Sequence, residues 1–201
     1  MSLSPAPDRA SASPSTELPK WKKKLPMALT WGRMAVCPFF ILLMIPSDPI
    51  WGWVASALFI IASITDWFDG YLARKYNVIS NLGKFMDPIA DKILVATVLI
   101  LLLPSGRVDP IVVILVLARD ILIGGIRSVA AADNVIIDAK PTGKWKTALQ
   151  MGAIPALLIN TPLFGLPIAE IGRALLWVSA VLSLISGYQY IQLYNENRKT
   201  P

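Results

Sequence analysis

The sequence contains no histidine and only one cysteine among its 201 residues. The absence of histidine removes the commonest general base and the commonest metal ligand of proteins. A single cysteine, Cys37, excludes an internal disulfide framework and a cysteine-ligated metal site. Any acid–base or metal chemistry therefore falls to carboxylates, lysine, tyrosine or water.

Charge is also scarce, since charged residues make up 16% of the chain and hydrophobic residues 55%. A soluble domain usually carries more charge than this. The apolar residues are concentrated in six segments, which are 27–45, 50–73, 88–103, 110–132, 147–163 and 168–193. About 20 residues of helix cross a bilayer, and backbone groups in lipid must bond within the chain. We therefore expect an all-α integral membrane protein with six transmembrane helices.

The distribution of basic residues predicts the orientation of these helices. Lysine and arginine gather before the first segment, after the second, before the fifth and after the sixth. Cytoplasmic loops carry such an excess, so both termini are expected in the cytoplasm. We expect the protein to reside in the bacterial cytoplasmic membrane, with its active site facing the cytoplasm. The net charge of +6 indicates this topology and an attraction to anionic lipids, and no nucleic-acid partner is expected.

The N-terminal stretch differs in composition from the remainder. Residues 1–19 are rich in serine, proline and alanine and lack the apolar core of a signal peptide. We expect a disordered tail there. Residues 20–201 are then expected to form one membrane domain.

Four aspartates lie at helix ends on the cytoplasmic side. Asp66 and Asp69 come late in the second segment, and Asp87 and Asp91 come early in the third, where Pro88 suits a first helical turn. Spacings of three and four residues place each pair on one helix face. A short loop makes the two helices antiparallel neighbours. Each carboxylate at membrane depth costs on the order of 2.5–3.5 kcal/mol, which is tolerable if all four converge on cations.

A carboxylate site without histidine or cysteine favours a hard ion, Mg²⁺ or Mn²⁺. Mg²⁺ usually binds a few carboxylates together with substrate phosphates, so the aspartates predict phosphoryl chemistry at a membrane surface. Carboxylates also cluster along ion pathways, and a cation transporter is the alternative from a different class. The enzyme and the transporter can be distinguished by their need for a nucleotide, because a transporter requires none.

The aspartates belong to a longer motif, which reads in order Asp66, Asp69-Gly70, Ala73-Arg74, Gly83, Asp87 and Asp91. The motif resembles the complete signature of the CDP-alcohol phosphotransferase family, whose six-helix fold matches the segment count. The resemblance implies two metal ions, Mg²⁺ or Mn²⁺, held by Asp66, Asp69, Asp87 and Asp91. It implies that Asp91 is also the catalytic base, and it implies a homodimer. It assigns donor binding to Thr30, Asp66, Gly70, Ala73, Arg74 and Gly83.

Basic residues in the second half of the chain bear on the acceptor. Arg127 follows Arg119 by eight residues, about 800° of rotation, so the two lie within roughly 80° on one face. Lys144 and Lys146 precede the fifth segment, beside the positive end of its helix dipole. Such a cationic pocket suits an acceptor that carries its own phosphate. Two simpler interpretations stay open: the lysines follow the positive-inside bias, and Arg119 pairs with Asp120 or with another buried acid.

Lys92 is expected to be structural, with its ammonium extended to the membrane interface. The stretches Leu29-Thr30, Arg119-Asp120 and Gly143 through Thr147 resemble the phosphatidylglycerophosphate synthase branch of the family. That branch joins CDP-diacylglycerol to sn-glycerol 3-phosphate and releases CMP. One departure is Met27, where members of the branch usually have asparagine. The alternatives for the acceptor are an inositol phosphate, inositol, serine or phosphatidylglycerol.

Overall fold

The computed structural model describes residues 32, 34–45, 48–75, 81–132, 141–163 and 165–199. Within these ranges it does not describe the side chains of 66–75, 81–88, 91, 131–132 and 198–199. The tail 1–19, Met27 and Thr30 lie outside the described residues. All regular structure in the described part is helical, apart from one isolated bridge between Leu163 and Leu166. The all-α expectation is therefore confirmed for this part of the chain.

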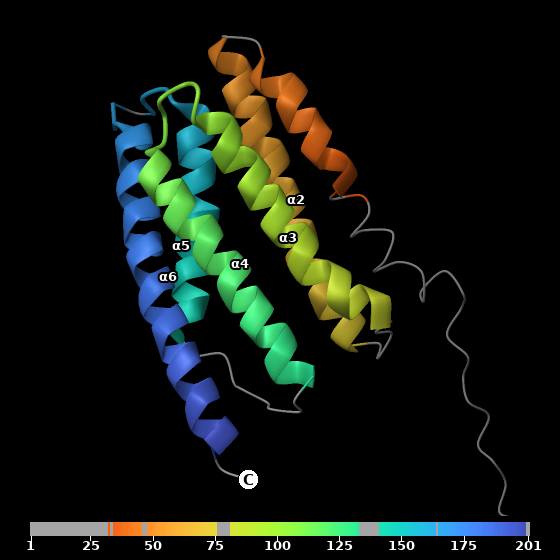
Figure 1. The fold of residues 1–201 in the computed structure, drawn as a ribbon. Coiled ribbons are helices and arrows are strands. Elements are labelled where there is room, and N and C mark those ends of the chain that lie inside the picture. Colours follow the sequence, from red (N-terminus) through yellow and green to blue (C-terminus); the bar gives the residue numbers. More distant parts are fainter. Residues whose placement is uncertain are drawn as a thin grey trace, which may run out of the picture.

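The helices form an up-and-down bundle. Their bounds are Met34–Met44, α2 Pro49–Lys75, α3 Asn81–Leu102, α4 Pro110–Ala132, α5 Pro141–Ile159 and α6 Ile168–Lys199. Helices α2 to α6 alternate in direction along the chain, as Figure 1 shows. Helix α5 packs most extensively against α6 and also against α2, while α4 packs against α6. The end of α2 and the starts of α3 and α5 lie at one end of the bundle (Figure 1).

Two of the expected helix starts are wrong. Helix α3 begins at Asn81 instead of 88, so Pro88 lies inside the helix and not in its first turn. Helix α5 begins at Pro141 instead of 147, with proline at a position that suits a helix start. Both errors have one cause: the prediction followed continuous apolar runs, whereas the first turns of each helix contain polar residues and glycine. For α4 the expected bounds, 110–132, agree with the structure.

The C-terminal end of α5 lies near the opposite end of the bundle. The helix ends at Ile159, four residues before the expected boundary, because Asn160 adopts a positive φ of 47°. Arg107, in the connection between α3 and α4, donates a hydrogen bond of 3.0 Å from Nη1 to the main-chain oxygen of Leu158. A cation at a helix C-terminus satisfies a terminal carbonyl and complements the helix dipole.

The core lies along the axis of the bundle and is apolar. Phe40 and Phe59 meet edge to face with ring centroids 6.5 Å apart. Small residues bring helices close: a β-carbon at Gly172 of α6 would lie 3.0 Å from the β-carbon of Ala156 on α5. The largest fully buried side chains are Phe40, Phe59, Leu94, Leu99, Leu102, Ile154, Leu157, Leu158, Leu176, Val98, Val112 and Val116.

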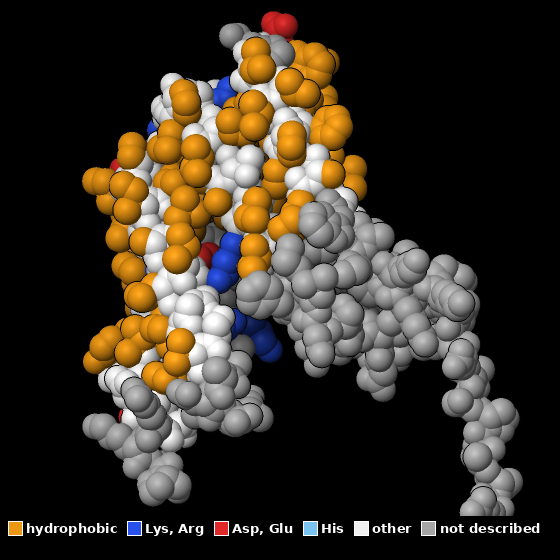
Figure 2. Space-filling model, turned by 45° about the vertical axis from the view of Figure 1, so that its right-hand side comes forward, with side chains coloured by type: hydrophobic (Ala, Val, Ile, Leu, Met, Phe, Trp, Pro, Cys, Tyr) orange, Lys and Arg blue, Asp and Glu red, His pale blue; other side chains and the backbone are white. Residues whose placement is uncertain are grey.

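The outer surface of the bundle is also apolar, as Figure 2 shows for one face. Ile61, Ile114 and Ile121 are more than half exposed, at 61%, 65% and 73%. Exposed apolar area of this extent is typical of a surface that contacts lipid or a partner. Within the described residues, one helical stretch is long and apolar enough to cross a membrane, Ile168–Asn197. Shorter apolar helices cover Met34–Met44, Pro49–Thr65 and Lys92–Leu102.

Candidate functional site

The four aspartates lie on two consecutive helices. Asp66 and Asp69 belong to the last part of α2, and Asp87 and Asp91 belong to the first part of α3. Because α2 and α3 run in opposite directions and are joined by residues 76–80, the four positions lie at the same end of the bundle (Figure 1). The side chains of these aspartates lie outside the described residues, so their convergence stays a prediction.

Most of the residues expected to bind the donor lie on the same two helices as the aspartates. Gly70, Ala73 and Arg74 lie on α2, and Gly83 lies on α3, while Thr30 falls outside the described residues. Among the side chains that the structure describes, no group of three or more acidic or cysteine residues is arranged to hold a metal ion. The only metal site that the sequence predicts is the one at the ends of α2 and α3.

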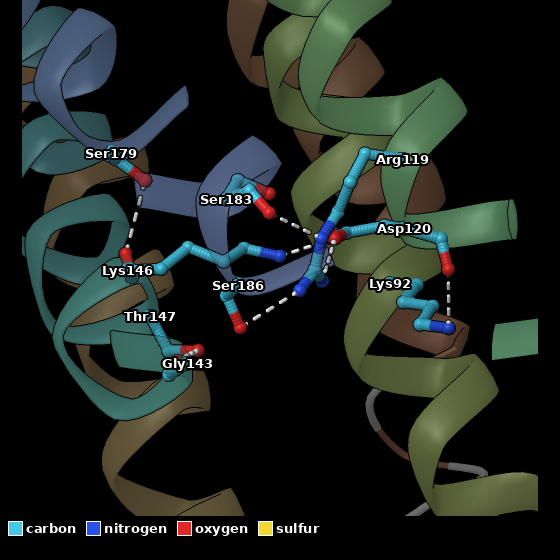
Figure 3. Close-up of polar contacts among 9 residues, drawn as sticks. All are labelled: Lys92, Arg119, Asp120, Gly143, Lys146, Thr147, Ser179, Ser183 and Ser186. Carbon is cyan, nitrogen blue, oxygen red and sulfur yellow. Dashed lines mark hydrogen bonds and ion pairs between the residues drawn. The ribbon is translucent and has the colours of Figure 1, made fainter. Parts of the chain in front are cut away.

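A cluster of charged side chains lies inside the bundle, between α4 and α5 (Figure 3). Asp120 Oδ1 accepts a hydrogen bond of 3.0 Å from Arg119 Nη1 and also pairs with Lys146 Nζ. The side chains of Arg119, Asp120 and Lys146 are 13%, 15% and 7% exposed. We call these three residues the Asp120 cluster. The open alternative that Arg119 pairs with Asp120 is thereby confirmed.

Helix α6 completes the surroundings of this cluster. Arg119 donates from Nε to the main-chain oxygen of Ser183 at 2.8 Å and from Nη2 to Ser186 Oγ at 3.3 Å. Ser179 Oγ donates to the main-chain oxygen of Lys146 at 3.0 Å. Buried polar atoms normally have partners, yet Ser183 Oγ and Gln150 Nε2 have none among the described residues. The polar lining next to Arg119 therefore retains hydrogen-bonding capacity.

Lys92 has a structural role, as expected, although its ammonium has a partner that the sequence did not indicate. Its Nζ donates a 2.8 Å hydrogen bond to the main-chain oxygen of Asp120 (Figure 3). Gly124, one turn further along α4, provides the room, because a β-carbon there would collide with this ammonium. Lys92 thus joins α3 to α4 beside the Asp120 cluster.

Arg127 and Lys144 have a different environment from Arg119 and Lys146. The guanidinium of Arg127 lies 5.2 Å from the ring centroid of Tyr190 on α6, a cation–π contact, and both Arg127 and Lys144 are exposed. Since Arg119 and Arg127 both contact α6, their expected shared face is confirmed. Exposure at the start of α5 also agrees with a purely topological role for Lys144, whereas Lys146 is buried and paired.

Among the side chains that the structure describes, two cations share the carboxylate of Asp120. Arg119 and Lys146 both bond to this carboxylate, so these three side chains together carry one net positive charge, while the ammonium of Lys92 bonds to the main-chain oxygen of Asp120. Figure 2 shows basic side chains gathered in the lower half of one face, with an acidic side chain beside them. Excess positive charge inside a bundle is favourable only with an anion nearby. Such an arrangement suits a phosphate or carboxylate group on a ligand.

Sequence reasoning did not identify the contacts from α6. Ser179, Ser183 and Ser186 recur at spacings of four and three, which places them on one face of α6 within the otherwise apolar stretch 174–187. That periodicity was the available signal. Tyr190 follows Ser186 by four residues and extends the same face toward Arg127.

Comparison with known proteins identifies the family of this chain. Residues 23–185 match the family model for CDP-alcohol phosphatidyltransferases. A protein of Rickettsia typhi named CDP-diacylglycerol–glycerol-3-phosphate 3-phosphatidyltransferase is 42% identical over 85% of this chain and 96% of its own. A protein of Bacillus subtilis with the same name is 37% identical over 88% of this chain and 97% of its own. A protein of Arabidopsis thaliana with this name followed by the number 2 is also 37% identical, over 84% of this chain and 78% of its own. The chain therefore belongs to the CDP-alcohol phosphatidyltransferase family of transferases.

Proposed function

We propose that this protein transfers the phosphatidyl group of CDP-diacylglycerol to sn-glycerol 3-phosphate, forming phosphatidylglycerophosphate and CMP in anionic phospholipid biosynthesis. The names of the similar proteins state this reaction for those proteins. The observation from the structure that carries the proposal is the pair of buried cations, Arg119 and Lys146, that meet at one carboxylate oxygen of Asp120. Inositol has no anionic group to match these cations, and the carboxylate of serine is accompanied by an ammonium, whereas glycerol 3-phosphate offers a phosphate without a cation of its own.

The chemistry of the acidic residues fits a hard divalent cation. Asp66, Asp69, Asp87 and Asp91 offer only carboxylate oxygens, the ligands that Mg²⁺ and Mn²⁺ prefer, and the chain contains no histidine to compete. We infer that these four residues hold two such ions. When bound, the ions would neutralise negative charge on the phosphoryl oxygens of the donor.

The remaining chemistry falls to residues of the chain. Asp91 would accept the proton of the acceptor hydroxyl, which then bonds to the β-phosphorus of the donor as the bond to CMP breaks. Arg74 would bind the diphosphate, because its guanidinium stays charged at any physiological pH. Thr30, Asp66, Gly70, Ala73 and Gly83 would complete the donor pocket.

The acceptor phosphate is assigned to the basic residues of α4 and α5. Arg119 and Lys146 would contact it from the interior of the bundle, and Arg127 and Lys144 from the exposed side. The closeness of Arg119 and Lys146 to one carboxylate oxygen supports their share of this role, since both cations reach the same point in space. Arg127 and Lys144 are assigned by charge and by position on the same two helices.

The proposal places the chain in the bacterial cytoplasmic membrane. Six spans, with both termini and the active site on the cytoplasmic side, agree with the apolar outer surface and with the basic residues at one end of the bundle. Residues 20–201 would form the membrane domain, and 1–19 a disordered tail. A homodimer remains an expectation from the family resemblance.

The test is an acceptor panel with purified protein, CDP-diacylglycerol and Mg²⁺. CMP release is measured with glycerol 3-phosphate, an inositol phosphate, inositol, serine and phosphatidylglycerol. We expect the highest kcat/KM with glycerol 3-phosphate, and a lipid product with the mass of phosphatidylglycerophosphate. A higher kcat/KM with another acceptor would show that the acceptor assignment is wrong while leaving the transfer chemistry in place.

A further inference from the structure

Asp120 occupies a central position among the cations, although sequence analysis gave it no role of its own. Its side chain bonds to Arg119 and Lys146, and its main-chain oxygen accepts from Lys92. Three helices, α3, α4 and α5, are thus joined through one residue (Figure 3). We propose that Asp120 is a positioning residue that holds Arg119 and Lys146 together to receive the acceptor's phosphate, a role that rests on the proposed function.

The electrostatic argument starts from the two cations. Arg119 and Lys146 lie on different helices and are largely buried, so their mutual repulsion is weakly screened by solvent. A carboxylate oxygen bonded to both offsets this repulsion and fixes the separation of the cations. One positive charge remains in excess, so the cluster still attracts an anion. Without the carboxylate the cations would move apart, and their hydrogen bonds to a single phosphate would be misaligned.

The other contacts of the cluster cannot replace this link. Arg119 is anchored to Ser183 and Ser186 of α6 by its remaining donors. The bond from Ser179 holds the main chain of Lys146 but leaves the direction of its ammonium unconstrained. Among the described contacts, only Asp120 connects the two cationic groups to each other. Lys92 in turn fixes the main chain of Asp120, and Lys92 directly follows Asp91 in sequence.

A purely structural salt bridge is the competing explanation. Removing one partner of a buried ion pair destabilises the fold whatever the pair does in catalysis. Such a loss would reduce the amount of active enzyme, and hence the measured maximal rate, but it would leave the KM of correctly folded molecules unchanged. A positioning role instead predicts a selective rise in the KM for glycerol 3-phosphate. The KM values for the two substrates therefore separate the explanations.

The experiment compares Asp120→Asn and Asp120→Glu with the wild type, and Asp109→Asn serves as the control. Asp109 immediately precedes the same helix, and its carboxylate accepts a 2.8 Å hydrogen bond from the main-chain nitrogen of Ile111, about ten residues before the cluster. We expect Asp120→Asn to raise the apparent KM for glycerol 3-phosphate about tenfold, the effect of misaligning charge-assisted hydrogen bonds. The KM for CDP-diacylglycerol should hardly change, and neither KM should change in Asp109→Asn.

Asp120→Glu keeps the charge and moves the carboxylate by one methylene. We expect it to recover part of the affinity, so that its KM for glycerol 3-phosphate lies between those of wild type and Asp120→Asn. If Asp120→Asn does not fold, the KM of Asp120→Glu for glycerol 3-phosphate tests the positioning role by itself. A second test combines Asp120→Asn with Lys146→Gln. If Asp120 acts by positioning Lys146, the double variant should have a KM close to that of Lys146→Gln alone, because the two changes remove one function.

The outcomes are distinguishable. If wild-type enzyme releases CMP with glycerol 3-phosphate, but both Asp120 variants retain the wild-type KM for it, the positioning role is wrong and the proposed function stands. A lowered KM in Asp120→Asn would equally overturn it, since Asp120 would then compete with the phosphate. If the wild type releases no CMP with glycerol 3-phosphate, the proposed function fails, and the role of Asp120 fails with it.

Discussion

The ammonium of Lys92 lies 2.8 Å from the main-chain oxygen of Asp120. This contact joins α3, which carries Asp87 and Asp91, to α4, which carries Arg119. The proposed base, Asp91, immediately precedes Lys92, and Arg119 immediately precedes Asp120. The hydrogen bond therefore links the helix that would activate the acceptor hydroxyl to the helix that would hold the acceptor phosphate.

Gly124→Ala tests this contact without removing a charge. The new β-carbon would collide with the Lys92 ammonium, the flexible end of a long side chain, so the ammonium should move while the helices stay folded. We expect kcat for the glycerol 3-phosphate reaction to fall by about ten- to a hundredfold, since small misplacements of reacting groups have effects of this size. Steady-state kinetics on the purified variants measure this kcat.

Gly125→Ala is the matched control for Gly124→Ala. It makes the same chemical change in the next residue of the same helix, where a β-carbon meets nothing within 4 Å. Both variants gain the same helix propensity, so any difference between them reports the Lys92 contact. Equal kcat values for the two variants would contradict a role for this contact in catalysis.

Metal removal should abolish activity. With EDTA in excess we expect no CMP release, and activity should return when Mg²⁺ or Mn²⁺ is added. Asp69→Asn and Asp87→Asn should each lose activity while accumulating as folded protein, because removing a carboxylate at membrane depth relieves a cost of burial. Asp48→Asn, at an exposed position before α2, is the control and should stay active. Full activity in excess EDTA would refute the metal site.

Labelling of single cysteines on intact cells tests the topology. In a Cys37→Ser background, cysteines at 75 and 144 should be protected from an impermeant thiol reagent, and cysteines at 47 and 105 should react. Positions 75 and 144 belong to the end of the bundle where α2 ends and α5 begins, and 105 belongs to the opposite end (Figure 1). The reverse labelling pattern would place the basic end outside the cytoplasm.

Arg127→Ala tests the exposed side of the acceptor pocket. We expect the apparent KM for glycerol 3-phosphate to rise about tenfold, because a charge-assisted hydrogen bond contributes roughly 1.5–3 kcal/mol. Arg74→Ala should instead raise the KM for CDP-diacylglycerol. Tyr190→Phe retains the ring under the guanidinium and should resemble wild type, whereas Tyr190→Ala should follow Arg127→Ala in part. An unchanged KM in Arg127→Ala would leave Arg127 with a topological role only.

The sequence predicted those features of the fold that depend on local composition. The bounds of α4 were predicted correctly because Pro110 opens a block that is apolar apart from a few polar residues and that extends to Ala132. The starts of α3 and α5 were not, since their first turns are polar and a hydropathy criterion excludes them. Helix formation in these turns has to be inferred from residues such as Pro141, which favours a first turn.

In the candidate site, too, the features that depend on local sequence were predicted and the tertiary contacts were not. The motif placed the four aspartates on the correct helices without knowledge of tertiary structure. The partners of Lys92 and Lys146 were missed because they depend on how α3 and α5 pack against α4, and a main-chain acceptor such as the Asp120 carbonyl has no sequence signature. The possible pairing of Arg119 with Asp120 was recognised because the two residues are adjacent in the chain.

The most direct test of the account is the stoichiometry of CMP release by the purified protein. With CDP-diacylglycerol, glycerol 3-phosphate and Mg²⁺, we expect one CMP for each phosphatidylglycerophosphate formed, no CMP when either substrate is omitted, and no product with Asp91→Asn. Release of CMP at the same rate without glycerol 3-phosphate, or undiminished transfer by Asp91→Asn, would contradict the proposed reaction or the proposed base.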